Sequence, residues 1–340
     1  MRFFFLSIGI AAVLVACDSE VTTTSGAGAS GPGSGPSSSG SGVGQGGAAA
    51  EASVVVSHLY VGTKTPGGVE DPKAWAAYGF NLDAQITSSD FSDHCRPQGN
   101  APPNSVFPDG NDGIDNSWGK YLLPIFKTAA AGLGGGEFEI AVNESVEQGL
   151  VSWAVVFGIG GSSAVSAPGS FFEVRDRAGD TWLKAPEAFS GDTPLTTFPD
   201  AMAQGAGWAS AVGSGTLQLN LSFGGLPLPF TVHHPRIRLV VDASGTSVIG
   251  GQLGGILDTE ELAAAVETSL GPFISCDGSA IDGILNQIRQ GSDIMVDGSQ
   301  DPNQPCNGIS FGMAFDGTTQ PIGDFAAPVI PPEDPCAADP

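Results

Sequence analysis

The chain has 340 residues, and its 36 acidic residues against 12 basic ones give a formal net charge of -24 at pH 7. Nucleic-acid phosphates and anionic lipid head groups attract patches of lysine and arginine, so this balance argues against both as binding partners. Cations, sugars and basic proteins are the ligand classes that fit the charge. The charge also keeps an exported protein soluble, without any ligand.

The first residues have the pattern of a secretory signal. Arg2 precedes an apolar run from Phe3 to Leu14, and Leu14 to Cys17 reads Leu-Val-Ala-Cys. A dozen apolar residues are too few for a transmembrane helix, which needs about 20. The pattern therefore predicts a signal peptide over residues 1–16 that the mature protein lacks.

The four residues that end at Cys17 resemble the lipobox of bacterial lipoproteins, whose cysteine is acylated. The resemblance implies that Cys17 carries the lipid, such as palmitate, and that the lipid bilayer is a partner. Two or more acyl chains anchor a protein stably. Asp18 resembles a signal for retention at the inner membrane of enteric bacteria, a rule that varies between bacteria. The choice between inner and outer membrane stays open.

A linker follows the expected lipid site, over residues 17–52, and its middle consists mainly of glycine, serine and alanine. Such a segment cannot bury enough apolar surface to offset its ordering entropy, so we expect a flexible tether. The strand and helix patterns all lie in residues 53–340, which we expect to form one domain. This layout resembles the uncharacterised envelope lipoproteins of Gram-negative bacteria, and the likeness implies no activity.

The domain alternates between strand and helix patterns. Expected strands cover residues 54–61, 150–159, 171–175, 181–184, 216–223, 228–233, 236–241, 247–253 and 309–315. Expected helices cover 118–129, interrupted at Pro124, then 137–147, a helix capped by Asp258 and Glu261 and ended by Gly271, and 279–291. We expect irregular segments at 71–108 and 191–215. The sum predicts an α+β fold with an antiparallel, β-sandwich-like sheet and packed helices.

Four cysteines remain after Cys17, namely Cys95, Cys276, Cys306 and Cys336. An even number in an exported chain predicts two disulfides, for which three pairings are possible. We expect Cys276 to pair with Cys306, because that bridge closes a loop of about 30 residues around one helix. Cys95 then pairs with Cys336. Zinc is the alternative, but the chain has no C-x-x-C pair to hold it.

One loop has the oxygen ligands that Ca²⁺ prefers, with Asp109, Asn111, Asp112 and Asp115 close together. Asp83, Asp90 and Asp93 could add further oxygens. The spacing departs from the EF-hand, since Lys120 occupies the twelfth position where a glutamate is required. A turn that caps the following helix is the alternative interpretation of the same residues.

Catalytic motifs are incomplete. Ser117 and Lys120 fit the S-x-x-K pattern of serine acyl-transferases, but the chain lacks the K-T-G sequence that accompanies it. His233 and His234 fall on an expected strand, where neighbouring side chains point to opposite faces and do not bind one ion together.

We therefore expect a non-catalytic binding or structural module of the cell envelope, with a protein or glycan partner. A calcium-dependent carbohydrate-binding module is the second hypothesis, in which Trp75, Trp182 or Trp208 stacks on sugar rings. An exported hydrolase is the third, and it requires two carboxylates that converge in a cleft.

Overall fold

Strands dominate the protein. The computed structural model describes residues 50–88, 93–99, 101–102, 107–132, 138–211, 215–223, 226–274 and 281–329. The expected signal peptide, Cys17, the linker up to residue 49, Asp90, Cys276 and Cys336 lie outside these ranges. The fold is α+β as expected, with 22 % helix, 42 % strand and a large, mainly antiparallel sheet.

Thirteen strands of the described chain form the main sheet. Its hydrogen-bonded order is β15-β5-β4-β2-β1-β14-β13-β12-β10-β9-β3, with β8 paired to β4 and β11 paired to β12. Their bounds are β1 Ala50–Tyr60, β2 Val151–Ile159, β3 Val165–Ser166, β4 Gly169–Ala178, β5 Thr181–Lys184, β8 Thr196–Phe198, β9 Met202–Gln204, β10 Gly207–Ala209, β11 Thr216–Phe223, β12 Leu226–Val240, β13 Ser247–Asp258, β14 Gly308–Thr318 and β15 Ile322–Phe325. A separate hairpin joins β6 Phe189–Ser190 to β7 Thr193–Pro194.

The main sheet folds over on itself. Strands β2 and β9, and likewise β4 and β11, contact each other although neither pair is joined by ladder hydrogen bonds. The sandwich-like arrangement encloses one large apolar core, and three smaller buried clusters lie apart from it. In the large core, the ring of Trp118 contacts those of Phe126, Phe138, Phe230 and Phe311 at centroid distances of 5.0 to 6.5 Å.

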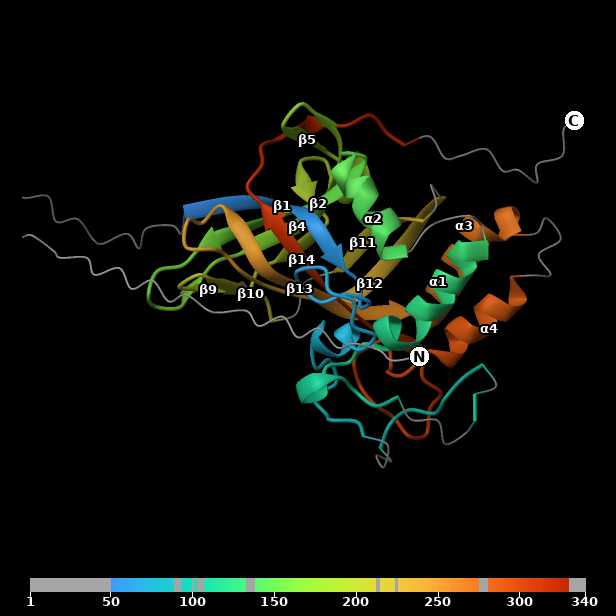
Figure 1. Ribbon diagram of the computed structural model, residues 1–340. Coiled ribbons are helices and arrows are strands. Elements are labelled where there is room, and N and C mark those ends of the chain that lie inside the picture. Colours follow the sequence, from blue (N-terminus) through green and yellow to red (C-terminus); the bar gives the residue numbers. More distant parts are fainter. Residues whose placement is uncertain are drawn as a thin grey trace, which may run out of the picture. The chain divides into compact units, whose positions relative to one another are not determined.

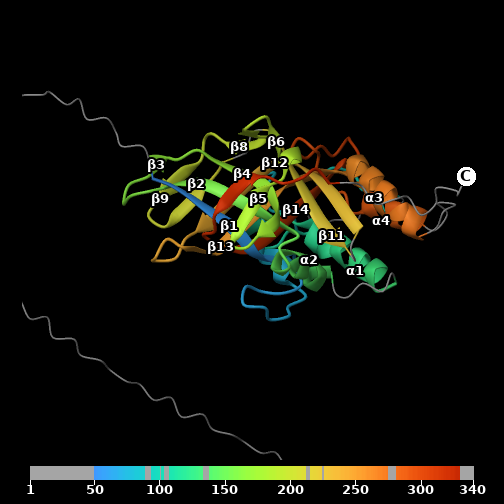
Figure 2. The ribbon, with the colours of Figure 1, turned by 90° about the horizontal axis from the view of Figure 1, so that it is seen from above.

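Helices gather at one end of the sheet (Figure 1), and β3 and β9 lie at the opposite end (Figure 2). The helices are η1 Ala74–Ala77, η2 Asn111–Gly113, the π-helix η3 Trp118–Leu122, α1 Leu123–Gly132, α2 Phe138–Glu147, η4 Pro186–Ala188, α3 Thr259–Ile274 and α4 Asp282–Gln290. The interruption expected at Pro124 is a change from a π-turn to an α-helix. Proline lacks the N–H that would otherwise bond back into this wide turn.

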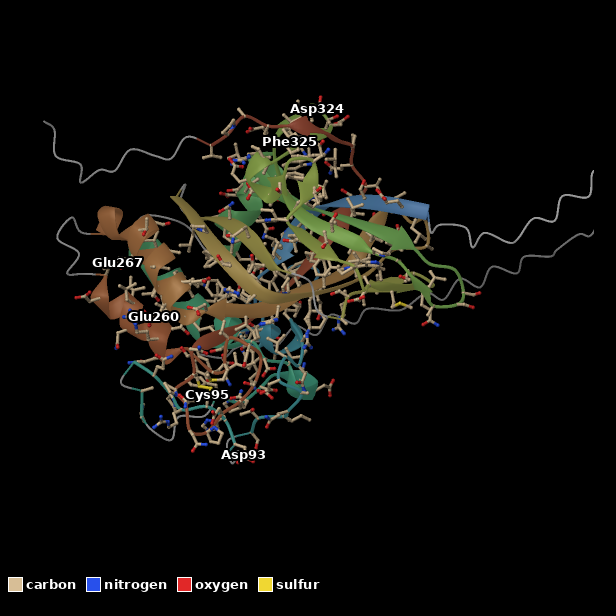
Figure 3. The ribbon with its side chains drawn as sticks, turned by 180° about the vertical axis from the view of Figure 1, so that it is seen from behind. Asp93, Cys95, Glu260, Glu267, Asp324 and Phe325 are labelled. Atoms are coloured by element: carbon tan, nitrogen blue, oxygen red, sulfur yellow. A yellow bond between two sulfur atoms is a disulfide. The ribbon has the colours of Figure 1, made fainter. Side chains whose placement is uncertain are left out.

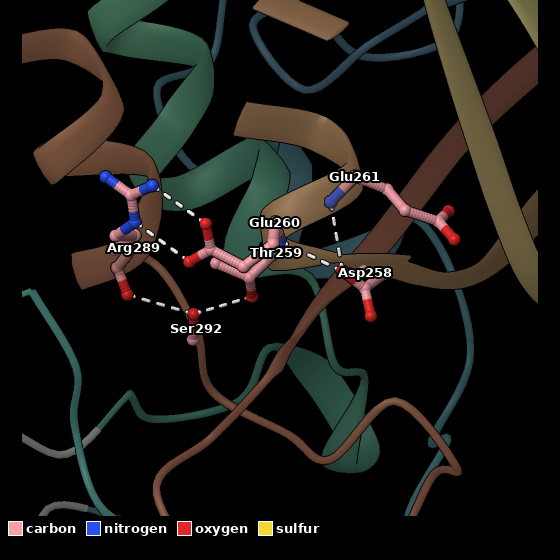
Figure 4. A network of polar contacts seen from close by, with 6 residues as sticks. All are labelled: Asp258, Thr259, Glu260, Glu261, Arg289 and Ser292. Atoms are coloured by element: carbon pink, nitrogen blue, oxygen red, sulfur yellow. Dashed lines mark hydrogen bonds and ion pairs between the residues drawn. The ribbon is translucent and has the colours of Figure 1, made fainter. Parts of the chain in front are cut away.

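The start of α3 is capped by Asp258, as expected (Figure 4). Its Oδ1 accepts the N–H groups of Glu260 and Glu261 at 2.9 and 3.0 Å. Arg289 of α4 binds both carboxylate oxygens of Glu260, at 2.8 and 2.7 Å, and so ties the two helices together. The expected end at Gly271 is wrong, since α3 continues to Ile274. Leu270 is fully buried, and its packing on the core stabilises the helix just before the position where the sequence predicts its end.

Two further expectations about strands are wrong. The segments 228–233 and 236–241 form one strand, β12, which passes through an irregularity between His233 and Arg236. A bulge accommodates the proline at position 235 and leaves the strand continuous. Residues 191–215 contain β7 to β10 rather than a plain loop. Strands of two or three residues are too short to show an alternation of apolar and polar side chains.

The expected disulfide pairing is also wrong, because Cys306 is bonded to Cys95 and not to Cys276. The segment after Cys95 runs beside residues 304–306, with Arg96 N–H donating to Gln304 O and Cys306 N–H to Arg96 O, each at 2.8 Å. This pairing holds the two cysteines side by side. Loop length alone favoured a local bridge, whereas the backbone hydrogen bonds bring together residues 211 positions apart. Figure 3 places Cys95 in the irregular region on one side of the sheet, with Phe325 on the other side.

Candidate functional site

A pocket of about 250 Å³ opens between the chain that follows β1 and the continuous helix formed by η3 and α1. Three of the chain's 12 basic residues line it. Its lining residues are Gly62, Thr63, Lys64, Glu70, Pro72, Gly119, Lys120, Leu123, Pro124 and Lys127, and we call it the lysine pocket. The local charge of this pocket is thus positive in a strongly acidic protein.

Two glycines allow the walls of the lysine pocket to approach each other. A Cβ atom on Gly119 would lie 2.7 Å from the Cβ of Trp75, and one on Gly62 would lie 3.1 Å from the same atom. Gly62 also has a φ of +126°, which side-chain-bearing residues rarely adopt. Trp75 therefore fixes the distance between the chain after β1 and the helix.

The helical wall is a single face of the chain. Lys120, Leu123, Pro124 and Lys127 are spaced at i, i+3, i+4 and i+7, the spacing that places side chains on one side of a helix. Lys64 comes from the opposite wall, where its backbone pairs with that of Glu70. The lysines are therefore held by two separate elements that face each other.

Lys120 is the most constrained of the three lysines. Its Nζ donates to Pro108 O at 2.8 Å and lies 4.8 Å from the ring centroid of Trp75 and 5.0 Å from that of Tyr121. Cation–π contacts of this kind stabilise an ammonium group that has lost part of its hydration. Burial lowers the pKa of Lys120, opposed by the negative charges of Asp109 and Asp293.

A buried carboxylate lies behind the wall of the lysine pocket. Thr63 donates to Glu139 Oε2 through its hydroxyl at 2.6 Å, and Glu139 is only 3 % exposed. The other carboxylate oxygen, Oε1, is buried and accepts no hydrogen bond from the described residues. A buried carboxyl oxygen without a hydrogen-bond partner is costly, so Glu139 Oε1 is an unsatisfied polar atom beside the lysine pocket.

Beyond Lys120 lies a group of four carboxyls, which we call the carboxyl cluster: Asp83, Asp109, Asp115 and Asp293. Asp115 Oδ2 accepts the N–H of Leu82 at 2.6 Å, and Asp109 Oδ2 accepts the N–H of Thr87 at 2.6 Å. Asp109 and Asp115 lie close enough for each carboxyl to affect the pKa of the other.

Burial shifts three members of the carboxyl cluster, Asp109, Asp115 and Asp293, toward their protonated forms. Burial and the charge of Asp83 raise the pKa of Asp115 far above its ordinary value, and burial raises that of Asp109 as well. Burial raises the pKa of Asp293 to about 7, although hydrogen bonds from Ser310 act against the rise. Like charges in a poorly hydrated space disfavour ionisation, so at neutral pH the cluster retains protons.

Asn116 connects the carboxyl cluster to the lysine pocket. Its Nδ2 donates to the carbonyls of Trp75, Tyr78 and Gly312 at 3.0 to 3.1 Å, and its Oδ1 accepts the N–H groups of Gly119 and Gly312 at 2.9 and 3.2 Å. One buried amide thus joins β14, the turn that carries Trp75 and the start of the helix. These hydrogen bonds hold the Trp75 turn at a fixed position relative to the helix, and both elements border the lysine pocket.

The residues of the expected calcium loop are not all brought together. Asp109 and Asp115 converge, whereas Asn111 and Asp112 are exposed on the outside of the turn. Asp83 belongs to the carboxyl cluster, and Asp93 is exposed. Within the described ranges, no three His, Cys, Asp or Glu side chains are arranged to hold a metal ion. The calcium site stays a prediction, and the alternative interpretation as a turn before the helix agrees with the backbone.

The other residues singled out in the sequence have structural surroundings. Trp182 and Trp208 are buried, at 1 % and 2 % exposure, and so are closed to a stacking sugar. The Ser117 hydroxyl donates to Gly291 O at 2.6 Å, while Lys120 points to Pro108. His233 Nε2 contacts Glu261 at 2.9 Å.

The helices of the described chain are each too short or too polar to cross a membrane.

Comparisons with protein-family models, with curated proteins and with solved structures find no match to this chain.

Proposed function

We propose that the protein is a lipid-anchored binding module of the cell envelope, and that its ligand is a small anion held in the lysine pocket. Cys17 is the anchoring residue in this proposal, as its lipobox-like sequence implies. The role is non-catalytic, and the domain serves to hold or deliver its ligand at the membrane.

The observation that carries this proposal is the local reversal of charge. Lys64, Lys120 and Lys127 converge on one small pocket, while the chain as a whole carries a net charge of -24. Ammonium groups on facing walls of one pocket make its electrostatic potential positive. An anionic ligand between them, such as a phosphate or a carboxylate, is attracted to all three.

The arrangement of the lysines also suits recognition. Lys120 is held by Pro108 O and by two aromatic rings, so its position costs little side-chain entropy on binding. Lys64 and Lys127 reach the pocket from facing walls. A volume of about 250 Å³ suits a ligand of a few to about a dozen heavy atoms.

The test is a thermal-shift titration of the full chain with inorganic phosphate and with citrate, at constant ionic strength. A ligand that binds only the folded state raises the melting temperature in proportion to RT ln(1 + [L]/Kd). We expect the double variant Lys64→Met, Lys127→Met to lose the shift produced by either anion.

Lys73→Met is the matched control, because Lys73 is an exposed lysine of the same region that does not line the pocket. It should keep the full shift. The same shift in the double variant, or no shift with either anion in the unmodified protein, would contradict an anion site in the lysine pocket.

A further inference from the structure

The sheet end opposite the helices is made of three neighbouring turns and the first residues of β1. Ala50 pairs with Ile159, the last residue of β2. Gly205 N–H donates to Gly161 O at 2.7 Å, and Val241 N–H donates to Ala206 O at 2.9 Å. These contacts join the segments 157–166, 201–210 and 239–251, which together with Ala50 we call the tether end.

The tether end is nearly free of charge. Across the whole chain 14 % of residues are charged, whereas these three segments contain a single charged residue, Asp242. Its carboxylate is bound within its own turn, by the Ser244 hydroxyl at 2.7 and 2.8 Å and by the N–H of Thr246 at 3.0 Å. Glu51, Asp200 and Arg238 flank the end, two of them acidic and one basic.

Exposed apolar side chains gather at the same end. Among the described residues, twelve large apolar side chains are exposed, and five of them belong to the tether end. These five are Ile159, Val165, Met202, Val240 and Ile249. Single exposed apolar residues are ordinary on a protein surface, but their gathering on an end with one charged residue indicates a surface that meets an apolar partner.

The path of the chain identifies that partner. Residues 18–49 connect Cys17 to Ala50, so the covalent link to the expected lipid enters the domain at the tether end (Figure 1). An anionic leaflet repels the acidic remainder of the domain, whereas the three segments of the tether end carry a single negative charge, that of Asp242. A covalent link also raises the effective concentration of bilayer at this end.

We propose that the tether end faces the lipid bilayer, with Ile159, Val165, Met202, Val240 and Ile249 in contact with the head-group region. This inference rests on the lipid anchoring of the proposed function. In this orientation the helices and the lysine pocket point away from the membrane, where they are open to a ligand in solution.

The experiment uses the acylated full chain in phosphatidylcholine vesicles that contain a small fraction of a phospholipid with a photoreactive diazirine in its head group. After illumination, mass spectrometry locates the lipid adducts, and flotation of the vesicles measures anchoring independently. We expect most adducts of the folded domain in the segments 157–166, 201–210 and 239–251.

Two pairs of substitutions separate docking from anchoring. The pair Val240→Asp, Ile249→Asp should lower the adduct yield in the three segments several-fold, while flotation stays unchanged because the acyl chains hold the protein. The matched pair Val69→Asp, Ile86→Asp changes exposed apolar residues elsewhere and should leave the adducts unchanged.

Adducts that lie mainly outside the tether end, or domain adducts that are absent from a protein that floats, would overturn the docking and leave the anchoring intact. A protein that does not float with the vesicles would overturn both.

Discussion

The side-chain carboxyls of Asp109 and Asp115 interact with each other, beside Asp83 and within the field of Asp293. The two residues begin and end the turn before η3. Each also accepts a backbone N–H from the irregular segment, Asp109 from Thr87 and Asp115 from Leu82. The two carboxyls therefore join the turn at 109–115 to the irregular segment that contains Leu82 and Thr87.

The burial of Asp109, Asp115 and Asp293 makes the free energy of unfolding depend on pH. Carboxyls in an unfolded chain titrate near 3.9, and burial raises the pKa values of Asp109, Asp115 and Asp293 in the folded protein, that of Asp293 to about 7. The folded state then binds more protons than the unfolded state above about pH 4, so the free energy of unfolding should fall as pH rises through 7. Melting temperatures measured between pH 5 and pH 9 test this expectation.

Asp115→Asn isolates the contribution of the pair, because an amide imitates the protonated carboxyl and still accepts from Leu82. We expect the variant to melt at least about 3 °C higher than the unmodified protein at pH 8, a shift of roughly 1 kcal/mol. The two should converge at pH 5. The control Asp112→Asn changes an exposed residue of the same turn and should follow the unmodified protein at every pH. A variant that melts lower at pH 8 would show that the ionised carboxylate is the stabilising form.

The buried tryptophans allow a matched comparison. Trp153 and Trp208 are both buried, but Trp208 Nε1 donates to Ala167 O at 2.7 Å, whereas Trp153 Nε1 has no hydrogen-bond partner among the described residues. Replacement by phenylalanine removes a similar volume at both positions. We expect Trp208→Phe to lower the free energy of unfolding by about 1–3 kcal/mol more than Trp153→Phe does, because it also leaves the buried carbonyl of Ala167 without a donor. Urea unfolding measures both, and equal losses would refute the assignment.

The disulfide is tested by peptide mapping without reduction, which should recover the Cys95 peptide joined to the Cys306 peptide. Cys95→Ser should lower the free energy of unfolding by up to about 5 kcal/mol, the chain-entropy value for so long a loop. Cys306→Ser should have the same effect, and the double variant should lose no more than either single one. A Cys276–Cys306 peptide would restore the pairing that loop length favours.

Lipid attachment is tested by metabolic labelling with palmitate. The unmodified chain should incorporate the label, and Cys17→Ala should abolish labelling and accumulate as unprocessed precursor, because the acyl chains attach to the cysteine sulfur and to the new N-terminus. Labelled lipid in the Cys17→Ala protein would refute the lipobox interpretation.

Much of the fold could be predicted from the sequence, because its longer elements are periodic. The strand at 216–223 and the strand at 181–184 have the expected bounds. The alternation of Leu217, Leu219 and Leu221 with polar residues reports one buried face directly. The short strands β8 to β10 could not be found, because two or three residues carry no period and their pairing partners lie far away in the chain.

The candidate site was harder to predict than the fold. Net charge describes the average field and favours cationic ligands, whereas the lysine pocket reverses the sign locally. Lys120 and Lys127 lie seven residues apart on one expected helix, and that spacing was the available signal. Lys64 reaches the pocket only through the path of the chain after β1, which no local pattern reports. The same holds for Asp293, whose place beside Asp109 depends on tertiary structure.

The place of β1 in the sheet determines the order in which the strands can pair. β1 lies between β2 and β14, and Val55 is paired with both Ala154 and Thr318. If the chain is exported from its N-terminus, β1 crosses the membrane early and can pair with β2. Its other edge stays unpaired until β14, one of the last strands, has also crossed. Cys95 stays without its disulfide partner, Cys306, over the same interval. Closure of the sheet and oxidation are then late, nearly simultaneous events, and the exported chain needs protection from aggregation until translocation is nearly finished.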